Sequence, residues 1–146
     1  MFFLDPFQQL WYRPPAYGEI QSIIDFETEL KAWAPCVIGS VIIGDMNVHH
    51  KPWLHYSNGI TPEGIALFRM CSRNSIEQLV KTPTRDKYLL DLVLSDIGQL
   101  LKVKVLTKLS GHNIVEIEMH VKVQVVPNKK RECWMWKQAK WPELQK

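Results

Sequence analysis

Two aspartates and a histidine stand inside or beside apolar segments, where charged side chains are unusual. Asp45 closes the run CVIGSVIIGD, Asp91 is the one charge within LLDLVLS, and His112 directly precedes an alternating run. A buried carboxylate is costly unless a partner satisfies it, and a lone one more often caps a turn than does chemistry. An aspartate bonded to one ring nitrogen of a histidine leaves the other nitrogen to transfer a proton or stabilise charge. Together the three residues suggest that kind of catalysis.

The elements that must position these residues alternate between helix and strand. Apolar residues recur at helical spacing over 17–34, at Ile20, Ile23, Ile24, Phe26, Leu30 and Trp33. The run 36–45 predicts a strand buried on both faces and ending in a turn. Thr61-Pro62-Glu63 predicts the start of a second helix, which ends near Ser72 and buries Ile65, Phe68 and Cys71.

The second half of the chain is predicted to be mostly strand. Residues 87–96 indicate another buried strand. Residues 101–109 and 113–125 alternate apolar and polar side chains, which predicts an antiparallel pair with one solvent-facing side. The fold class is therefore α/β, and the strand ends carrying Asp45, Asp91 and His112 are expected to meet at one edge of a sheet.

Composition limits the classes of protein to consider. A chain of 146 residues fits one domain, and 46% hydrophobic with 23% charged residues is typical of a globular protein, which excludes disordered and membrane-spanning classes. The start, MFFLDPFQQLW, is apolar for only four residues, is interrupted by Asp5 and Pro6 and has no basic leader. It predicts neither a signal peptide nor a span, so we expect an intracellular protein, nuclear or cytoplasmic and not secreted.

Cysteine and charge usage add two expectations. Cys36, Cys71 and Cys133 are odd in number and have no CxxC spacing, which argues against a disulfide framework or a zinc cage and predicts core thiols. The net charge of +3 permits a polyanionic partner, but the excess lies mostly within 126–140, a run that is more often a solvated tail.

Several motifs in order carry a family resemblance. VIIGDMNVHHKPW, LLDLVLS and LSGHNIVEI resemble the Gly-Asp-x-Asn, Leu-Asp and Ser-Asp-His patterns of the endonuclease/exonuclease/phosphatase superfamily. YRPP, KTPTR and the final RECWMWKQAKWPELQK are similar to its branch in non-LTR retrotransposons, whose nuclease leads into a reverse transcriptase. The resemblance implies a DNase I-like two-sheet α/β sandwich over residues 1–126, followed by a basic Trp-rich tail, 127–146.

The resemblance also implies roles for particular residues. Asp45 and Asn47 would hold the scissile phosphate and the attacking water, Tyr12 would contact the phosphate, and Asp91 would orient His112. The implied cofactor is Mg²⁺ and the implied partner is DNA, because phosphodiester hydrolysis needs a hard cation on oxygen ligands and donors aimed at the transition state.

The loop after Asn47 is expected to be a surface for nucleic acid. His49, His50 and Trp53 match the Asn-x-His-His-x-x-Trp pattern of the retrotransposon branch, which gives the two histidines no catalytic role. We interpret the three as residues that contact DNA. A zinc site built from the histidines is disfavoured because no third ligand stands at a suitable spacing.

The sequence departs from the family pattern in two places. Gly111 stands where Ser-Asp-His has its aspartate, so one carboxylate is replaced by a residue without a side chain. The family's domain also begins well before Tyr12, with a strand bearing Asn and a segment bearing the principal metal Glu. We therefore expect a partial sandwich lacking its N-terminal strands, with weak Mg²⁺ binding and a sheet face or edge that a missing N-terminal half or another chain would cover.

Three functional hypotheses follow from these observations. The first is a fragment of a Mg²⁺-dependent DNA endonuclease from a retrotransposon polyprotein, inactive as this chain. The second is a non-catalytic module that binds nucleic acid or protein through its basic tail and the His-His-Trp loop, with salt-sensitive affinity for phosphates. The third is a decayed transposon product without function. The sequence favours the first as ancestry and does not choose among the three.

Overall fold

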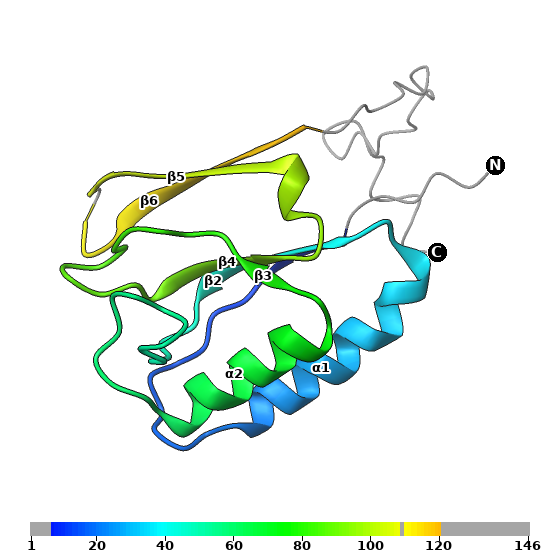
Figure 1. Cartoon of the computed structure of the whole chain (residues 1–146), viewed down its shortest axis with the longest axis horizontal. Helices are drawn as coiled ribbons and strands as arrows, with labels where there is room; N and C mark the ends of the chain where they lie inside the picture. Colours follow the sequence, from blue (N-terminus) through cyan, green and yellow to red (C-terminus); the bar gives the residue numbers. More distant parts are fainter. Residues whose placement is uncertain (1–6, 109, 121–146) are drawn as a thin grey trace, which may run out of the picture.

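The part of the protein that the structure describes folds into two sheets and two helices. The structure is a computed structural model that describes residues 7–108 and 110–120. The strands of the first sheet lie in the order β1-β2-β4-β3, and β5 and β6 form a second, two-stranded sheet. Helices α1 and α2 cover one side of the four-stranded sheet, and the β5–β6 hairpin lies on the other side (Figure 1). The predicted α/β architecture with two sheets is confirmed.

The four-stranded sheet is mixed. β1 (Phe7–Leu10) runs parallel to β2 (Ser40–Asp45), because α1 (Gln21–Trp33) and the short 3₁₀ turn η1 (Ala34–Cys36) connect the two strands. β4 (Asp91–Ser95) lies antiparallel to β2, and β3 (Glu77–Gln78) pairs with the other edge of β4. The core fills the space between the helices and this sheet, where Ile42, Leu92 and Leu94 lie, and continues on the opposite face of the sheet with Val41 and Val93.

The buried face of α1 is narrower than the sequence predicts. Ile23, Phe26 and Leu30 are buried, whereas three other apolar residues are substantially exposed: Ile20 (40%), Ile24 (46%) and Trp33 (49%). One layer of sheet and a single neighbouring helix cover only one stripe of the α1 surface, so its remaining apolar side chains stay at the edge of the core.

Helix α2 (Pro62–Arg73) starts as predicted but buries a different face. The Thr61 hydroxyl accepts a hydrogen bond from the Gly64 amide at 3.2 Å, and Pro62 takes the first helical position. Leu67 and Met70 are buried with Cys71, but Phe68 is 37% exposed, and the prediction that it belongs to the core is wrong. Its ring packs on the loop before α2, as described below.

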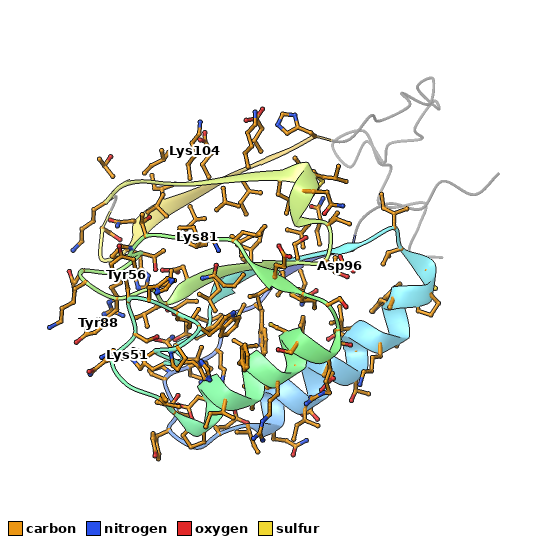
Figure 2. The ribbon with its side chains drawn as sticks, in the orientation of Figure 1. Lys51, Tyr56, Lys81, Tyr88, Asp96 and Lys104 are labelled. Carbon is orange, nitrogen blue, oxygen red and sulfur yellow. The ribbon has the colours of Figure 1, made fainter. Side chains whose placement is uncertain are left out.

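The hairpin of β5 (Leu101–Lys108) and β6 (Asn113–Met119) follows the predicted alternation. Val103, Val105, Val115 and Ile117 pack against the core, and charged side chains face outward, including Lys104, which points away from the four-stranded sheet (Figure 2). The 3₁₀ turn η2 (Gly98–Leu100) connects β4 to this hairpin. The predicted strand over 113–125 ends at Met119, and residues 121–125 lie outside the described residues.

Two of the three cysteines fall within the described residues. Cys71 is buried, and loss of solvation raises the pKa of its thiol to about 12. Cys36 is exposed, so its prediction as a core thiol is wrong, because it lies in the η1 turn rather than in β2. Cys133 and the tail 127–146 lie outside the described residues, as does the proposed domain boundary.

Within the described residues, the β1 edge of the first sheet carries one exposed apolar side chain. β1 is a terminal strand of the four-stranded sheet, and Leu10 at its end is 80% exposed. A covering partner stays a prediction. No helix in residues 7–108 and 110–120 combines the length and the hydropathy needed to cross a bilayer.

A buried carboxylate network joins the two helices and sets a testable pH dependence. Arg73 donates a hydrogen bond to Glu27 at 2.5 Å, Asn74 and Lys31 each contact the same carboxylate at 3.0 Å, and these contacts lower the pKa of Glu27 from 4.5 to about 2. Because the pKa is depressed in the folded state, the stabilisation is present above pH 4.5 and is lost as pH falls toward 2.

Glu27→Gln should therefore lower the free energy of unfolding by roughly 2–3 kcal/mol at pH 7, and the difference should disappear near pH 2. Urea unfolding at both pH values measures it. Glu29→Gln, an exposed substitution on the same helix, is the matched control. An equal loss for both variants at pH 7 would contradict the assignment.

Candidate active site

Asp45 and Asp91 lie side by side because their strands are paired in register. Asp45 is the last residue of β2 and Asp91 the first of β4, and the two are directly opposite each other in the antiparallel ladder. Directly opposed residues point to the same face of a sheet with their Cβ atoms about 5 Å apart. The turn before β6 adds His112, whose Nδ1 lies 2.8 Å from Oδ2 of Asp91.

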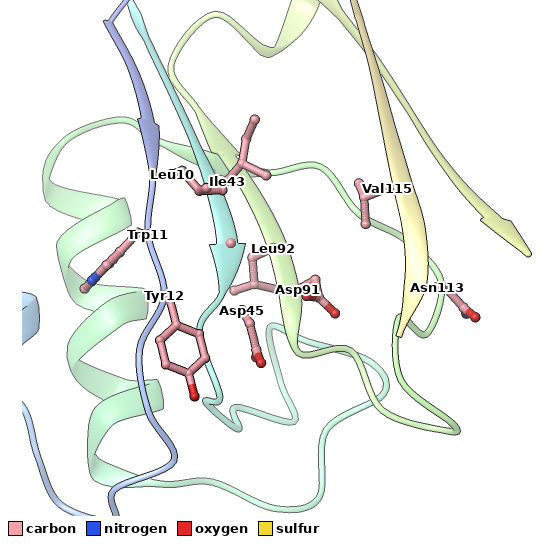
Figure 3. A pocket seen from close by; sticks show the side chains of 10 residues that line it. Leu10, Trp11, Tyr12, Ile43, Asp45, Asp91, Leu92, Asn113 and Val115 are labelled. Carbon is pink, nitrogen blue, oxygen red and sulfur yellow. The ribbon is translucent and has the colours of Figure 1, made fainter. Parts of the chain in front are cut away.

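These three side chains form one cluster. Their ligand atoms all lie within 4.8 Å of one another, and each residue is only partly buried. Asp45, Asp91 and His112 therefore lie together, as the sequence predicts. They come from three segments of the chain: the end of β2, the start of β4 and the turn between β5 and β6. Figure 3 shows Asp45 beside Tyr12, with Asp91 on the neighbouring strand.

Asp45 is the member of the cluster whose carboxylate is the least well satisfied. Its Oδ1 is buried and has no hydrogen-bond partner among the described residues. Burial raises the pKa of Asp45, and the nearby charge of Asp91 raises it further, while Asn47 and His112 oppose the shift. A carboxylate held in this way favours binding of a proton or a cation, either of which would relieve the desolvated charge.

Asp45→Asn should stabilise the protein at neutral pH. Because the pKa of Asp45 is higher in the folded than in the unfolded protein, the folded protein loses stability as pH rises through the folded pKa. The amide that replaces the carboxylate cannot ionise, so Asp45→Asn avoids this loss of stability. We expect a higher melting temperature than the unmodified chain at pH 7 and no difference below pH 4, measured by thermal unfolding. Asp25→Asn on the exposed face of α1 is the control. A lower melting temperature for Asp45→Asn at pH 7 would contradict the assignment.

Asn47 is fixed beside Asp45 by the segment that carries Tyr12. It has φ 48°, in the left-handed region that asparagine tolerates better than most residues, and its Nδ2 donates a hydrogen bond to the Arg13 carbonyl at 2.9 Å. The Arg13 amide in turn donates to the Asp45 carbonyl at 2.9 Å. Arg13, the residue after Tyr12, is therefore bonded to both Asp45 and Asn47 of the Gly-Asp-x-Asn motif.

Arg13 is a residue that sequence reasoning missed. It is only 1% exposed, and its guanidinium donates to the carbonyls of Ala16 and Glu19, which closes the loop between β1 and α1. The only signal in the sequence was its position between a tyrosine and two prolines, which marks an extended segment but says nothing about burial.

Tyr12 borders an apolar cavity of about 320 Å³ next to the carboxylates. Its side chain is 67% exposed and points toward the same end as Asp45 (Figure 3). The cavity lies between β1, β2 and β4 on one side and β6 on the other. Its apolar lining comes from Leu10, Trp11, Ile43, Leu92 and Val115.

The His-His-Trp loop is held against α2. The His50 ring stacks on Phe68 with centroids 4.8 Å apart, and Trp53 contacts the same phenyl ring at 5.5 Å. His49 accepts a hydrogen bond from the Asn58 amide at 3.2 Å, and burial lowers the pKa of His49. All three residues are half-buried, and none belongs to the Asp45 cluster. Contact with DNA at this loop stays a prediction.

The carboxylates of Asp45 and Asp91 could hold a hard cation that takes few of its ligands from the protein. Mg²⁺ prefers oxygen, keeps several waters, and is commonly held by one or two carboxylates plus substrate phosphates. Asp45 offers a free buried oxygen and Asp91 a second carboxylate whose Oδ2 already contacts His112. Gly111, next to His112, adds no ligand. The residues present therefore fit a weakly held, largely hydrated cation.

Comparisons with known proteins support the fold. No protein-family model and no curated protein matches the sequence. Among solved structures, the chain is similar to the endonuclease domain of TRAS1, a telomere-specific non-LTR retrotransposon, with a TM-score of 0.63 and 19% identity. The match covers 78% of this chain and 58% of that one. The predicted two-sheet α/β fold is confirmed by this structural likeness.

Proposed function

We propose that this chain is part of a magnesium-dependent DNA endonuclease of the non-LTR retrotransposon type, and that these 146 residues alone cleave DNA negligibly. One observation carries the proposal. Asp45, Asp91 and His112 come together from distant segments in a fold similar to that of a retrotransposon endonuclease domain. Neither the cleavage reaction nor the cation follows from the fold alone, so the support comes from the chemistry of the cluster.

Each side chain of the cluster suits one part of phosphodiester hydrolysis. With Nδ1 of His112 turned to Asp91, its Nε2 is the nitrogen left to accept a proton, and it donates a hydrogen bond to a phosphate oxygen only when the ring carries both protons. The desolvated Asp45 carboxylate suits proton acceptance from an attacking water. Asn47 adds a neutral polar group where another carboxylate would repel the phosphate. A bound divalent cation would supply neutralisation of phosphate charge.

The proposed lack of cleavage rests on the small number of carboxylates. Among the described residues, the cluster holds two, and one of them already contacts a histidine. Gly111 has no side chain to add a third. Mg²⁺ dehydrates reluctantly and needs several correctly placed oxygens, so the affinity of such a site for the ion should be low.

A plasmid assay tests the proposed activity. Supercoiled plasmid is incubated with the chain and Mg²⁺, alongside Asp45→Ala. The unmodified chain should produce no more nicked plasmid than the variant does. Nicking that disappears in Asp45→Ala would overturn the proposed inactivity and establish an enzyme.

Binding of DNA is tested separately from cleavage. In an NMR titration with a short duplex, the backbone amides of Asp45, Asn47 and Asn113 should shift, because they flank the proposed phosphate site. Shifts confined to the tail, together with a salt-dependent gel shift that is lost when Lys129, Lys130 and Arg131 become Ala, would contradict the proposed site and favour a binding module.

A further inference from the structure

Thr84 is a buried residue that contacts the backbone of the proposed site. It lies in the segment between β3 and β4 and is 0% exposed. Its hydroxyl oxygen accepts hydrogen bonds from two successive amides, those of Leu90 at 3.1 Å and Asp91 at 2.9 Å. The Thr84 side chain therefore holds the backbone of the residue that contacts His112.

The backbone of the same segment also holds Asn113, the residue that follows His112. The Thr84 carbonyl accepts a hydrogen bond from the Asn113 amide at 2.7 Å, and Asn113 Nδ2 donates to the Pro83 carbonyl at 3.0 Å. Asn113 directly follows His112 and begins β6. The Thr84 amide donates to the Tyr88 carbonyl at 2.9 Å, which closes a turn around the residue.

These bonds matter because Asp91 and His112 lie in or beside different sheets. β4 belongs to the four-stranded sheet and β6 to the two-stranded one, and no strand pairing within the described residues joins the two sheets. A hydrogen bond such as the 2.8 Å contact between Asp91 and His112 weakens steeply with small changes of distance or angle. Something outside the strand ladders must therefore set the spacing between these strand ends.

We propose that Thr84 is the positioning residue that performs this task. Its hydroxyl fixes the start of β4, its carbonyl fixes the start of β6, and the two together keep the His112 ring against the Asp91 carboxylate. A catalytic role for the contact between Asp91 and His112 rests on the proposed function, but the positioning of the two side chains by Thr84 does not.

The tautomer of the neutral His112 ring gives a direct test. A carboxylate facing Nδ1 selects the neutral tautomer that carries its proton on Nδ1. In ¹⁵N NMR of the ring, the unmodified chain and Thr84→Ser should both show that tautomer. Thr84→Val keeps the volume but removes the acceptor of two buried amides, and the Nδ1–H to Nε2–H ratio should fall at least about fivefold.

Two controls separate positioning from general stability. Thr28→Val removes a hydroxyl that donates to the Ile24 carbonyl on the exposed face of α1, and it should leave the tautomer ratio unchanged. Asp91→Asn should lower the ratio as Thr84→Val does. An unchanged ratio in folded Thr84→Val would overturn the proposal, and so would a failure of Thr84→Ser to keep the unmodified ratio.

Hydrogen exchange in the unmodified chain decides the case if Thr84→Val does not fold. The amides of Leu90, Asp91 and Asn113 should be protected to the same extent as that of Val93 in the middle of β4. Exchange at the rate of an unbonded loop amide would overturn the proposal. None of these measurements involves DNA or a cation, so their outcome is independent of whether the proposed function holds.

Discussion

Gly44→Ala should lower the free energy of unfolding by about 3 kcal/mol or more, the largest effect expected of any single added methyl group here. A Cβ at Gly44 would lie 1.7 Å from the carbonyl oxygen of Trp11 and 2.7 Å from its carbonyl carbon. Neither atom belongs to a flexible side chain, so β2 and the segment after β1 would have to separate. That movement would break the hydrogen bond from the Trp11 amide to the Ile43 carbonyl, which is 2.8 Å long.

The same substitution should disturb the site as well as the stability. Asp45 follows Gly44, and the Arg13 amide bonds to its carbonyl, so displacement of the Tyr12–Arg13 segment also releases Asn47. Urea unfolding gives the free energy, and the amide shifts of Asp45 and Asn47 report the site. Gly111→Ala is the matched control, because nothing lies within 4 Å of its added Cβ, and its effect should stay within about 0.5 kcal/mol. Equal effects of the two would contradict the close approach at Gly44.

Gly111→Asp should raise the affinity for Mg²⁺ or Mn²⁺ about tenfold, which corresponds to about 1.4 kcal/mol. The family pattern has an aspartate at this position, and the space around position 111 is open, so the side chain can be added without displacing neighbours. A carboxylate within about 6 Å of a divalent cation contributes several kcal/mol of attraction at an effective dielectric constant near 20, before desolvation and ordering reduce it. Titration calorimetry or Mn²⁺ relaxation measures the change.

Gly111→Asn separates charge from shape in this experiment. It is nearly the same size as aspartate but neutral, so it should bind the cation no better than the unmodified chain. If both variants gain affinity equally, the gain does not come from the added charge. If neither does, a carboxylate at position 111 does not reach the cation, and the proposed reason for weak binding is wrong.

The local sequence was sufficient to predict most elements. The start of α2 follows from Thr61 and Pro62, and the strands β2, β4, β5 and β6 follow from their apolar runs and alternation. The errors concern which side of an element is covered and where a strand begins. Phe68 was predicted in the core but packs on His50, because the loop before α2 folds back over that side of the helix. Cys36 falls in a turn because β2 begins at Ser40.

The site was only partly predictable from the sequence. Asp45, Asp91 and His112 were singled out by residue type and by their places at strand ends, and the structure brings them together. Arg13 and Thr84 lie in the quoted motifs YRPP and KTPTR, but neither was given a role, because an arginine before prolines and a threonine in a loop have no periodic pattern that indicates burial. Their importance is visible only in the backbone groups that they contact.

By itself the sequence determined the α/β class, the approximate positions of the helices and strands, and the types of side chain available for chemistry. Periodicity and capping act over a few neighbouring residues, so they can be recognised without a structure. The tertiary structure decided which carboxylate lacks a partner, which ring nitrogen of His112 is occupied, and which buried side chains hold the strand ends in place. These properties depend on bonds between segments 21 to 34 residues apart, such as Asp91 with His112 and Arg13 with Asn47, and no local pattern specifies them.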